Sequence, residues 1–464
     1  AAVSDKVQAD VTAPTDVPAL SADETELVLT LGGDAVLGTR EYWWNDPESL
    51  PAYLNQYGMA YPFSGLQSLF AYDDMTFINL ECALKDDGKG GNANKGIVWV
   101  ARRIPDGYVS AHANQARITT FPKNDPENCL YAPDVVSFAR EMGYYDGPDA
   151  DFSFCDAYAP LDFGALRACE ARVWAFFRTV ADDMDRYADY AMGHNAANRM
   201  PLWVMPREKV SPKTVFDCMR DHYEGTPLDI SRDFGAGPYH TPYRLSPLSF
   251  KVGDKEYFNE RPISTQQSGF VFVAQMRSTL PDAIGGVLWF GTDDANMTVF
   301  TPVYCCTDKV PVCYSRVDGA DYITFSWNSS FWIFNWVSNM VYPRYDLMIG
   351  DVRATQTELE TTFNEAQEGI ETAAAKLLEK DPAKAKTFLT NYTNMTAQST
   401  LDAWKRLGEF MIVKYNDGVV KRMKDGKFER NSIGQPAGVV RPGYPKEFLE
   451  EYVKQTGDRY KMPQ

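Results

Sequence analysis

The chain has 464 residues, of which 44% are hydrophobic and 13% aromatic, so it can bury a large core and is not an unfolded sequence. Its formal net charge of −17 opposes binding to phosphate backbones, and we expect no nucleic-acid partner. No apolar run is long enough to cross a bilayer, so the sequence predicts no membrane span.

The first residues, 1–26, are rich in Ala, Asp, Thr, Ser and Pro and lack apolar periodicity. This composition is typical of a flexible tether of the kind that follows a secretion signal. It favours an exported protein, which would be periplasmic or extracellular and could be tethered at the cell surface. Residues 27–84 then predict a strand–helix–strand unit, and the polar, glycine-rich stretch 85–96 predicts a linker.

Within the first unit, residues 27–31 and 75–80 are expected to be strands, and residues 62–72 a helix. From residue 97 to residue 464 the pattern predicts a mixed α+β body with a helical region over 351–416. The expected strands of this body are 97–101, 108–111, 270–276, 286–290, 297–304 and 322–327. The expected helices are 133–142, 164–190, 351–380, 383–390 and 396–415, with a hairpin turn at 424–427. The apolar run 331–337 is short and strand-like.

Cysteine and histidine spacing points to no cofactor and no metal. The eight cysteines contain no CxxC pair, and no two of the four histidines have the spacing of a helical metal pair. Cys305 and Cys306 are adjacent, and we expect both to be buried thiols on a strand.

Long motifs in the second part of the chain carry a family resemblance. They are GIVWVARRIPDG at 96–107, SAHANQARI at 110–118, DHYEGTP at 221–227, PISTQQ at 262–267 and GQPAGVVRPGYP at 434–445. Together they resemble the dipeptidase A family of cysteine-type N-terminal-nucleophile (Ntn) peptidases over residues 91–464. The resemblance implies an αββα sandwich and hydrolysis of dipeptides or short peptides.

In such enzymes a mature N-terminal Cys attacks the peptide carbonyl, and its own α-amino group acts as the general base. The resemblance implies that Asn114 donates to the oxyanion and that Arg172 lies near the nucleophile. Asn114 can instead bond a neighbouring turn, and Arg172 can instead form a helix salt bridge.

Further polar residues are candidates for substrate binding. His112 lies in the same motif as Asn114, and Asp221, His222 and Glu224 form a second polar group. A structural histidine and a plain loop network are the competing interpretations of these residues.

The opening of the family pattern is not found here. Family members begin their mature chain with Cys and continue for well over a hundred residues before the GIVW segment, whereas the first cysteine here is Cys82. Cleavage before Cys82 would create an N-terminal nucleophile, and a buried thiol at a strand end is the alternative. The expected sandwich is therefore possibly incomplete at its N-terminal strands, and exposed sheet edges would need a cover.

Residues 27–84 are similar instead to the start of the poly-γ-glutamate capsule-biosynthesis family, which has a metallophosphatase-like fold. The similar segments are LGGDAVLG at 31–38, YPFSG at 61–65 and INLE at 78–81. The resemblance places Asp34 and Asn79 near a metal, although two ligands do not make a site.

Three hypotheses follow: a dipeptidase-family hydrolase, a catalytically inactive peptide-binding or scaffold protein, and a capsule-polymer metallohydrolase. Cysteine-dependent turnover separates the first from the second, and a copurifying metal supports the third.

Overall fold

The computed structural model describes residues 29–32, 75–78 and 98–463. The chain forms two compact units, one of residues 1–97 with 275–286 and one of residues 98–274 with 287–464. The helices of the described ranges are α3 Val135–Glu141, α4 Phe154–Tyr158, α5 Ala171–Val180, α6 Ala188–Ala191, α7 Pro212–Met219, α8 Asp282–Gly285, α9 Ser330–Val341, α10 Tyr345–Leu378, α11 Pro382–Tyr415 and α12 Lys446–Thr456. None of them is long and apolar enough to cross a membrane.

The strands are short, and seven small sheets combine them within the described residues. They are β1 Leu29–Gly32, β2 Met75–Ile78, β3 Val100–Arg102, β4 Val109–Ser110, β5 Cys129–Tyr131, β6 Trp203–Val204, β7 Ser249–Val252, β8 Lys255–Phe258, β9 Phe270–Gln275, β10 Val287–Thr292, β11 Thr301–Tyr304, β12 Val420–Lys421, β13 Met423–Lys424, β14 Lys427–Phe428 and β15 Val439–Val440. Helices and sheets are mixed, as the α+β expectation requires.

In the first unit, β1 and β2 pair in parallel, with Leu29 opposite Met75 and Gly32 opposite Ile78. The two strands expected at 27–31 and 75–80 are therefore confirmed. The helix expected at 62–72, Asp34, Asn79 and Cys82 lie outside the described residues.

The second unit begins with two antiparallel strand pairs. The expected strands at 97–101 and 108–111 are present as β3 and β4, and the turn between them is closed by Tyr108 N–H donating to the Pro105 carbonyl at 3.0 Å. The strands do not pair with each other: β3 pairs with β5, and β4 with β6. Residues far along the chain therefore supply the partners, which local sequence cannot specify.

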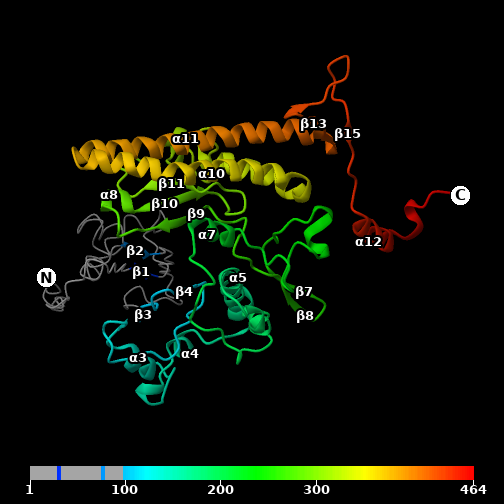
Figure 1. Cartoon of the computed structure of the whole chain (residues 1–464). Helices are drawn as coiled ribbons and strands as arrows, with labels where there is room; N and C mark the ends of the chain where they lie inside the picture. The colour runs from blue at the N-terminus through cyan, green and yellow to red at the C-terminus, as the bar shows by residue number, and fades with distance from the viewer. Residues whose placement is uncertain (1–28, 33–74, 79–97, 464) are drawn as a thin grey trace. The chain divides into compact units, whose positions relative to one another are not determined.

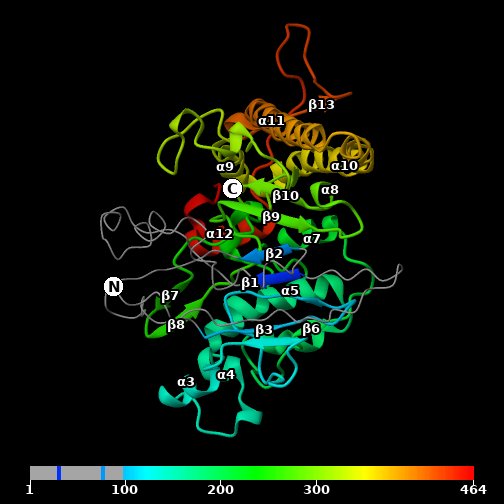
Figure 2. The ribbon, with the colours of Figure 1, turned by 90° about the vertical axis from the view of Figure 1, so that its left-hand side faces the viewer.

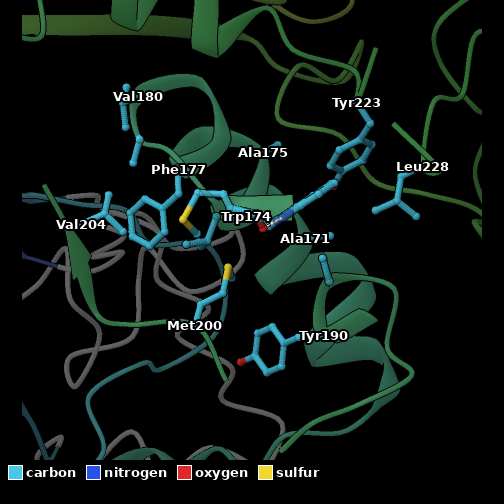
Figure 3. Close-up of a cluster of buried hydrophobic side chains, with 14 of the residues drawn as sticks. Ala171, Trp174, Ala175, Phe177, Val180, Tyr190, Met200, Val204, Tyr223 and Leu228 are labelled. Carbon is cyan, nitrogen blue, oxygen red and sulfur yellow. Dashed lines mark hydrogen bonds between the residues drawn. The ribbon is translucent and has the colours of Figure 1, made fainter. Parts of the chain in front are cut away.

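The expectation of a single helix over 164–190 is wrong, because the structure has four distinct helical segments there. A π-helical segment, Ala165–Glu170, leads into α5, and Asp183 then adopts a left-handed φ of 59° before two short helical turns. α5 ends at Val180 because Ala181 is extended, with φ of −127° and ψ of 161°, and the left-handed Asp183 prevents the helix from resuming in register. Its buried face anchors a hydrophobic cluster that includes Trp174, Phe177 and Val204 (Figure 3).

The larger sheet of the second unit has the order β11-β10-β9, and the helices α10 and α11 pack together along it (Figure 1). A view turned by 90° shows the same arrangement of α9, α10 and α11 beside β9 and β10 (Figure 2). Phe334 of α9 stacks on Trp404 of α11 with ring centroids 4.5 Å apart, and both rings are buried.

Four further expectations about this part of the chain are wrong: three concern residues 297–337, and the fourth concerns α11. The run 331–337 lies in α9, because its Ile333, Phe334 and Val337 recur at helical spacing and are all buried. Residues 297–299 form no strand, so β11 is only the second half of the expected one. Residues 322–327 make a turn with a bridge between Asp321 and Thr324.

The helices expected at 383–390 and 396–415 are one continuous helix, α11. Within the stretch between them Thr393 is buried, and its hydroxyl accepts a hydrogen bond from the backbone N–H of Tyr304 at 3.2 Å. Tertiary contacts thus override a local sequence that favours a break. The expected C-terminal hairpin is confirmed, with Asp425 and Gly426 at positive φ between β13 and β14.

Candidate functional site

The segment after β4 presents two of the expected site residues. His112 and Asn114 are exposed, whereas Gln115 and Arg117 are buried. β4 ends at Ser110, so Asn114 lies in the segment that follows the strand. The extended segment therefore turns one set of side chains outward and anchors itself with the other.

Arg117 anchors this segment through a buried ion pair with Glu170. Its Nε donates to the two carboxylate oxygens of Glu170 at 3.0 and 3.1 Å, and the side chains are only 4% and 2% exposed. The Tyr190 hydroxyl donates to the same carboxylate at 3.1 Å. Opposite charge and added hydrogen bonds are what a buried ion pair needs.

Asn114 and Arg172 are brought into contact. The Arg172 Nη2 donates to the amide oxygen of Asn114 at 2.8 Å, and its Nε donates to the Ala168 carbonyl at 2.7 Å. Burial, together with the positive charge of Arg261, lowers the pKa of Arg172. Since the Asn114 oxygen accepts from Arg172, the amide nitrogen is left as a donor for a further acceptor.

His112 has an exposed ring beside these cations. Desolvation by neighbouring atoms is the main cause that lowers the pKa of His112, and the positive charge of Arg117 lowers it further. The Glu170 carboxylate opposes this shift. The imidazole is therefore neutral at neutral pH. A neutral ring can donate or accept a hydrogen bond beside a polar substrate.

The loop after α7 holds the second group of expected residues. His222 Nδ1 lies 3.0 Å from Glu224 Oε1, and the His222 backbone N–H donates to Glu224 Oε2 at 2.7 Å. Burial acts to raise the pKa of Glu224, but the bonds and charge of His222 outweigh it and lower that pKa. Burial raises the pKa of Asp221 to about 6. The loop is internally bonded, as the network interpretation expected.

Tyr223 links this loop to the surroundings of Arg172. Its backbone is left-handed, with φ of 66°, and its buried hydroxyl donates to the Arg261 carbonyl at 2.7 Å. Tyr223 and Leu228 belong to the same hydrophobic cluster as Ala171 of α5 (Figure 3). A strained aromatic residue persists only where packing fixes it, so the loop is held against α5.

An open cavity of about 470 Å³ begins directly after Glu224. Its lining comprises Gly225, Thr226, Pro227, Leu228, Asp229, Arg232, Asp233 and Glu260. Asp221, His222 and Glu224 do not line it. A volume of this size is typical of small-ligand sites.

The cysteines of the described ranges are free thiols, and Cys82 lies outside those ranges. Cys305 is exposed and Cys306 half-buried, in a turn after β11, so the expectation of two buried strand thiols is wrong. β11 ends at Tyr304, so neither cysteine lies on the strand. Over the described residues, no three His, Cys, Asp or Glu side chains gather as a metal site.

The sequence interpretation missed Arg117, Glu170 and Tyr190. A signal was available, because Arg117 lies three residues after Asn114 and Glu170 two residues before Arg172. Charged residues inside otherwise apolar motifs are buried only when paired.

Comparison with known proteins assigns the chain to a peptidase class. The profile described as Peptidase family C69 matches residues 70–358, which is more than half of the chain and includes Cys82. The chain belongs to peptidase family C69.

Curated relatives are similar at low identity. A probable dipeptidase of Salmonella dublin is 28% identical over 209 residues, which are 45% of this chain and 42% of the relative. Dipeptidase A of Lactobacillus helveticus is 24% identical over 237 residues, 51% of this chain and 43% of the relative. A probable dipeptidase A of Streptococcus pyogenes serotype M3 is 22% identical over 254 residues, 53% and 48% respectively. These matches span less than half the length of each relative.

Proposed function

We propose that this chain is a dipeptidase-type peptidase that uses cysteine-type Ntn chemistry. The observation that carries the proposal is the contact between Asn114 and Arg172. These two residues lie 58 positions apart, and the family resemblance implies a role near the nucleophile for both. The family match and the names of the relatives support a peptide substrate.

The proposed roles follow from the donors at the site. The Asn114 amide nitrogen donates to the oxyanion of the tetrahedral intermediate, and the Arg172 guanidinium holds the amide in that orientation. A donor fixed before the reaction needs no reorganisation when the charge develops. The neutral His112 lies two residues away and contacts the polar part of the substrate.

The nucleophile in this proposal is a cysteine whose thiol attacks the peptide carbonyl while its α-amino group removes the thiol proton. Cys82 is the candidate, because it falls within the range that matches the family, and cleavage of the Glu81–Cys82 peptide bond first frees the α-amino group that acts as the base. The thiol gains the acyl group, the leaving amine takes the proton, and water then releases the acyl group.

The cavity after Glu224 is the proposed place for the rest of the peptide. Its lining includes Asp233, Glu260 and Arg232, which are residues of both charges and suit an unblocked peptide with two charged ends. The αββα arrangement is part of the proposal, supported by the sheet β9–β11 with α10 and α11 beside it.

Hydrolysis of a dipeptide panel by the full chain, before and after cleavage ahead of Cys82, with and without thiol alkylation, tests the function. Because Cys305 is exposed, the matched control is the double variant Cys305→Ser and Cys306→Ser, which removes an irrelevant alkylation target. The proposal expects turnover by this variant that alkylation abolishes, with the modified site mapped to Cys82.

Absence of turnover on every dipeptide, with peptide binding retained, would support the alternative of a catalytically inactive peptide-binding protein. Turnover that survives complete alkylation would rule out the cysteine mechanism.

A further inference from the structure

We infer that the buried Arg117–Glu170 pair positions the Asn114–Arg172 contact by tying the segment after β4 to the start of α5. The inference rests on the proposed function, because it assigns Arg117 and Glu170 as positioning residues for that centre. Neither side chain contacts the proposed reacting atoms.

Arg117 fixes both ends of the segment that carries Asn114. Its Nη1 donates to the Ala111 carbonyl at 3.2 Å, so the guanidinium bridges residues on either side of Asn114. The same group donates to the Leu202 carbonyl at 3.1 Å, and Nη2 donates to the Pro201 carbonyl at 2.9 Å. Together with the two bonds to Glu170, the rigid planar fork of Arg117 donates five hydrogen bonds, which define the direction of the segment as well as its distance.

Glu170 supplies the other end of the brace. It lies two residues before Arg172, where the π-helical segment passes into α5. Its carboxylate receives the Arg117 Nε and the Tyr190 hydroxyl, so the beginning of α5 is fixed relative to the segment that carries Asn114. Arg117 also lies over the Phe177 ring, with its guanidinium carbon 5.3 Å from the centroid, which adds a second contact with α5.

Stability alone does not account for such a pair. Removing two charges from water costs about as much as their attraction returns, and apolar residues of similar volume often serve as well. What the pair supplies is direction, since a small displacement of a catalytic group lowers the rate steeply. An apolar contact at this position would leave the Asn114 segment free to slide along α5.

Glu170→Gln is the test variant, and Glu360→Gln is the matched control. Glu360 also forms a largely buried ion pair with Arg220, and each of these two side chains is 11% exposed. It lies on α10, far along the chain from Asn114 and Arg172. Arg117→Lys is the second test variant, because it keeps the positive charge but removes the planar fork.

Each variant is examined by crystallography and by dipeptide kinetics. In Glu170→Gln and Arg117→Lys, we expect loss of the 2.8 Å bond between Arg172 Nη2 and Asn114 Oδ1. We also expect kcat to fall about ten- to a hundredfold with KM nearly unchanged. Glu360→Gln should keep both the bond and kcat while losing a similar amount of thermal stability.

The structural readout separates this inference from the proposed function. If the wild-type chain lacks turnover, the function fails, and the Asn114–Arg172 distance in the variants still decides the inference. Retention of that bond in both test variants, or an equal loss of kcat in the Glu360→Gln control, would overturn it. Should Glu170→Gln fail to fold, Arg117→Lys and Tyr190→Phe provide the same comparison.

Discussion

Two regions of the second unit bury acidic side chains in opposite ways. Near the proposed site, Glu170 faces the guanidinium of Arg117. Beside the sheet β9–β11, the adjacent Asp293 and Asp294 are 1% and 0% exposed and receive neutral donors. Asn335 and Ser338 donate to Asp293 at 3.0 and 2.7 Å.

Asp294 accepts from the Tyr342 hydroxyl at 3.0 Å and from the Met297 backbone at 2.9 Å. Burial raises the pKa of both aspartates, and the charge of Asp293 raises that of Asp294 further. A carboxyl pair without a cation therefore makes the region beside the sheet sensitive to changes in pH.

The largest expected effect breaks the ion pair. Arg117→Ala leaves the Glu170 carboxylate buried without its cation, and we expect the free energy of unfolding to fall by about 3–5 kcal/mol. Urea denaturation of the variant and the wild type measures the loss. A loss below about 1 kcal/mol would mean that solvent or another group replaces Arg117 easily.

The second prediction concerns the pair without a cation. Because the folded-state pKa of Asp294 is raised above its ordinary 3.8, the folded chain keeps a proton that the unfolded chain releases, and stability falls as the pH rises above that value. Asp294→Asn removes this penalty, so the variant should gain stability relative to the wild type as the pH rises toward 8. Chemical denaturation at several pH values measures the difference, and a constant difference would contradict the account.

A smaller effect of the same sign is expected at Asp221. Burial raises its pKa from 3.8 to about 6, so its unfavourable contribution develops between these two values and is complete above the upper one. Asp221→Asn should gain roughly 1–3 kcal/mol relative to the wild type across that window. Its amide oxygen can still accept from the Tyr223 N–H, as the carboxylate does at 3.0 Å. Melting temperatures from pH 4 to pH 8 follow the change, and a flat profile would show that Asp221 is solvated.

Local patterns predicted elements whose causes are local. The helix α3, the strands β9 and β10 and the Asp425–Gly426 hairpin follow from periodicity and turn chemistry, and the structure confirms them. The run 331–337 was misassigned because a short apolar segment suits a buried strand or a buried helix equally. Joining of the two parts of α11 depends on Thr393 facing β11, a contact between distant residues.

The family resemblance predicted roles for Asn114 and Arg172, and the structure brings the two side chains into contact. The sequence did not predict the buried residues that hold their segments in place. The sequence shows that Arg117 and Glu170 are charged. That they pair across 53 positions can be seen only in the folded structure. For the same reason the cavity lies beside Gly225 and Asp229 rather than at His222. The position of a loop relative to a helix is fixed by buried contacts such as that of Tyr223.

The most direct test of the central claim is the turnover of Asn114→Ala on the best dipeptide substrate, compared with the wild type. The account predicts that kcat falls about 10²–10³-fold, the cost of removing one oxyanion donor, with KM changed little. An unchanged kcat, or a wild-type chain that hydrolyses no dipeptide, would contradict the assignment of Asn114 and Arg172 as the centre of a peptidase site.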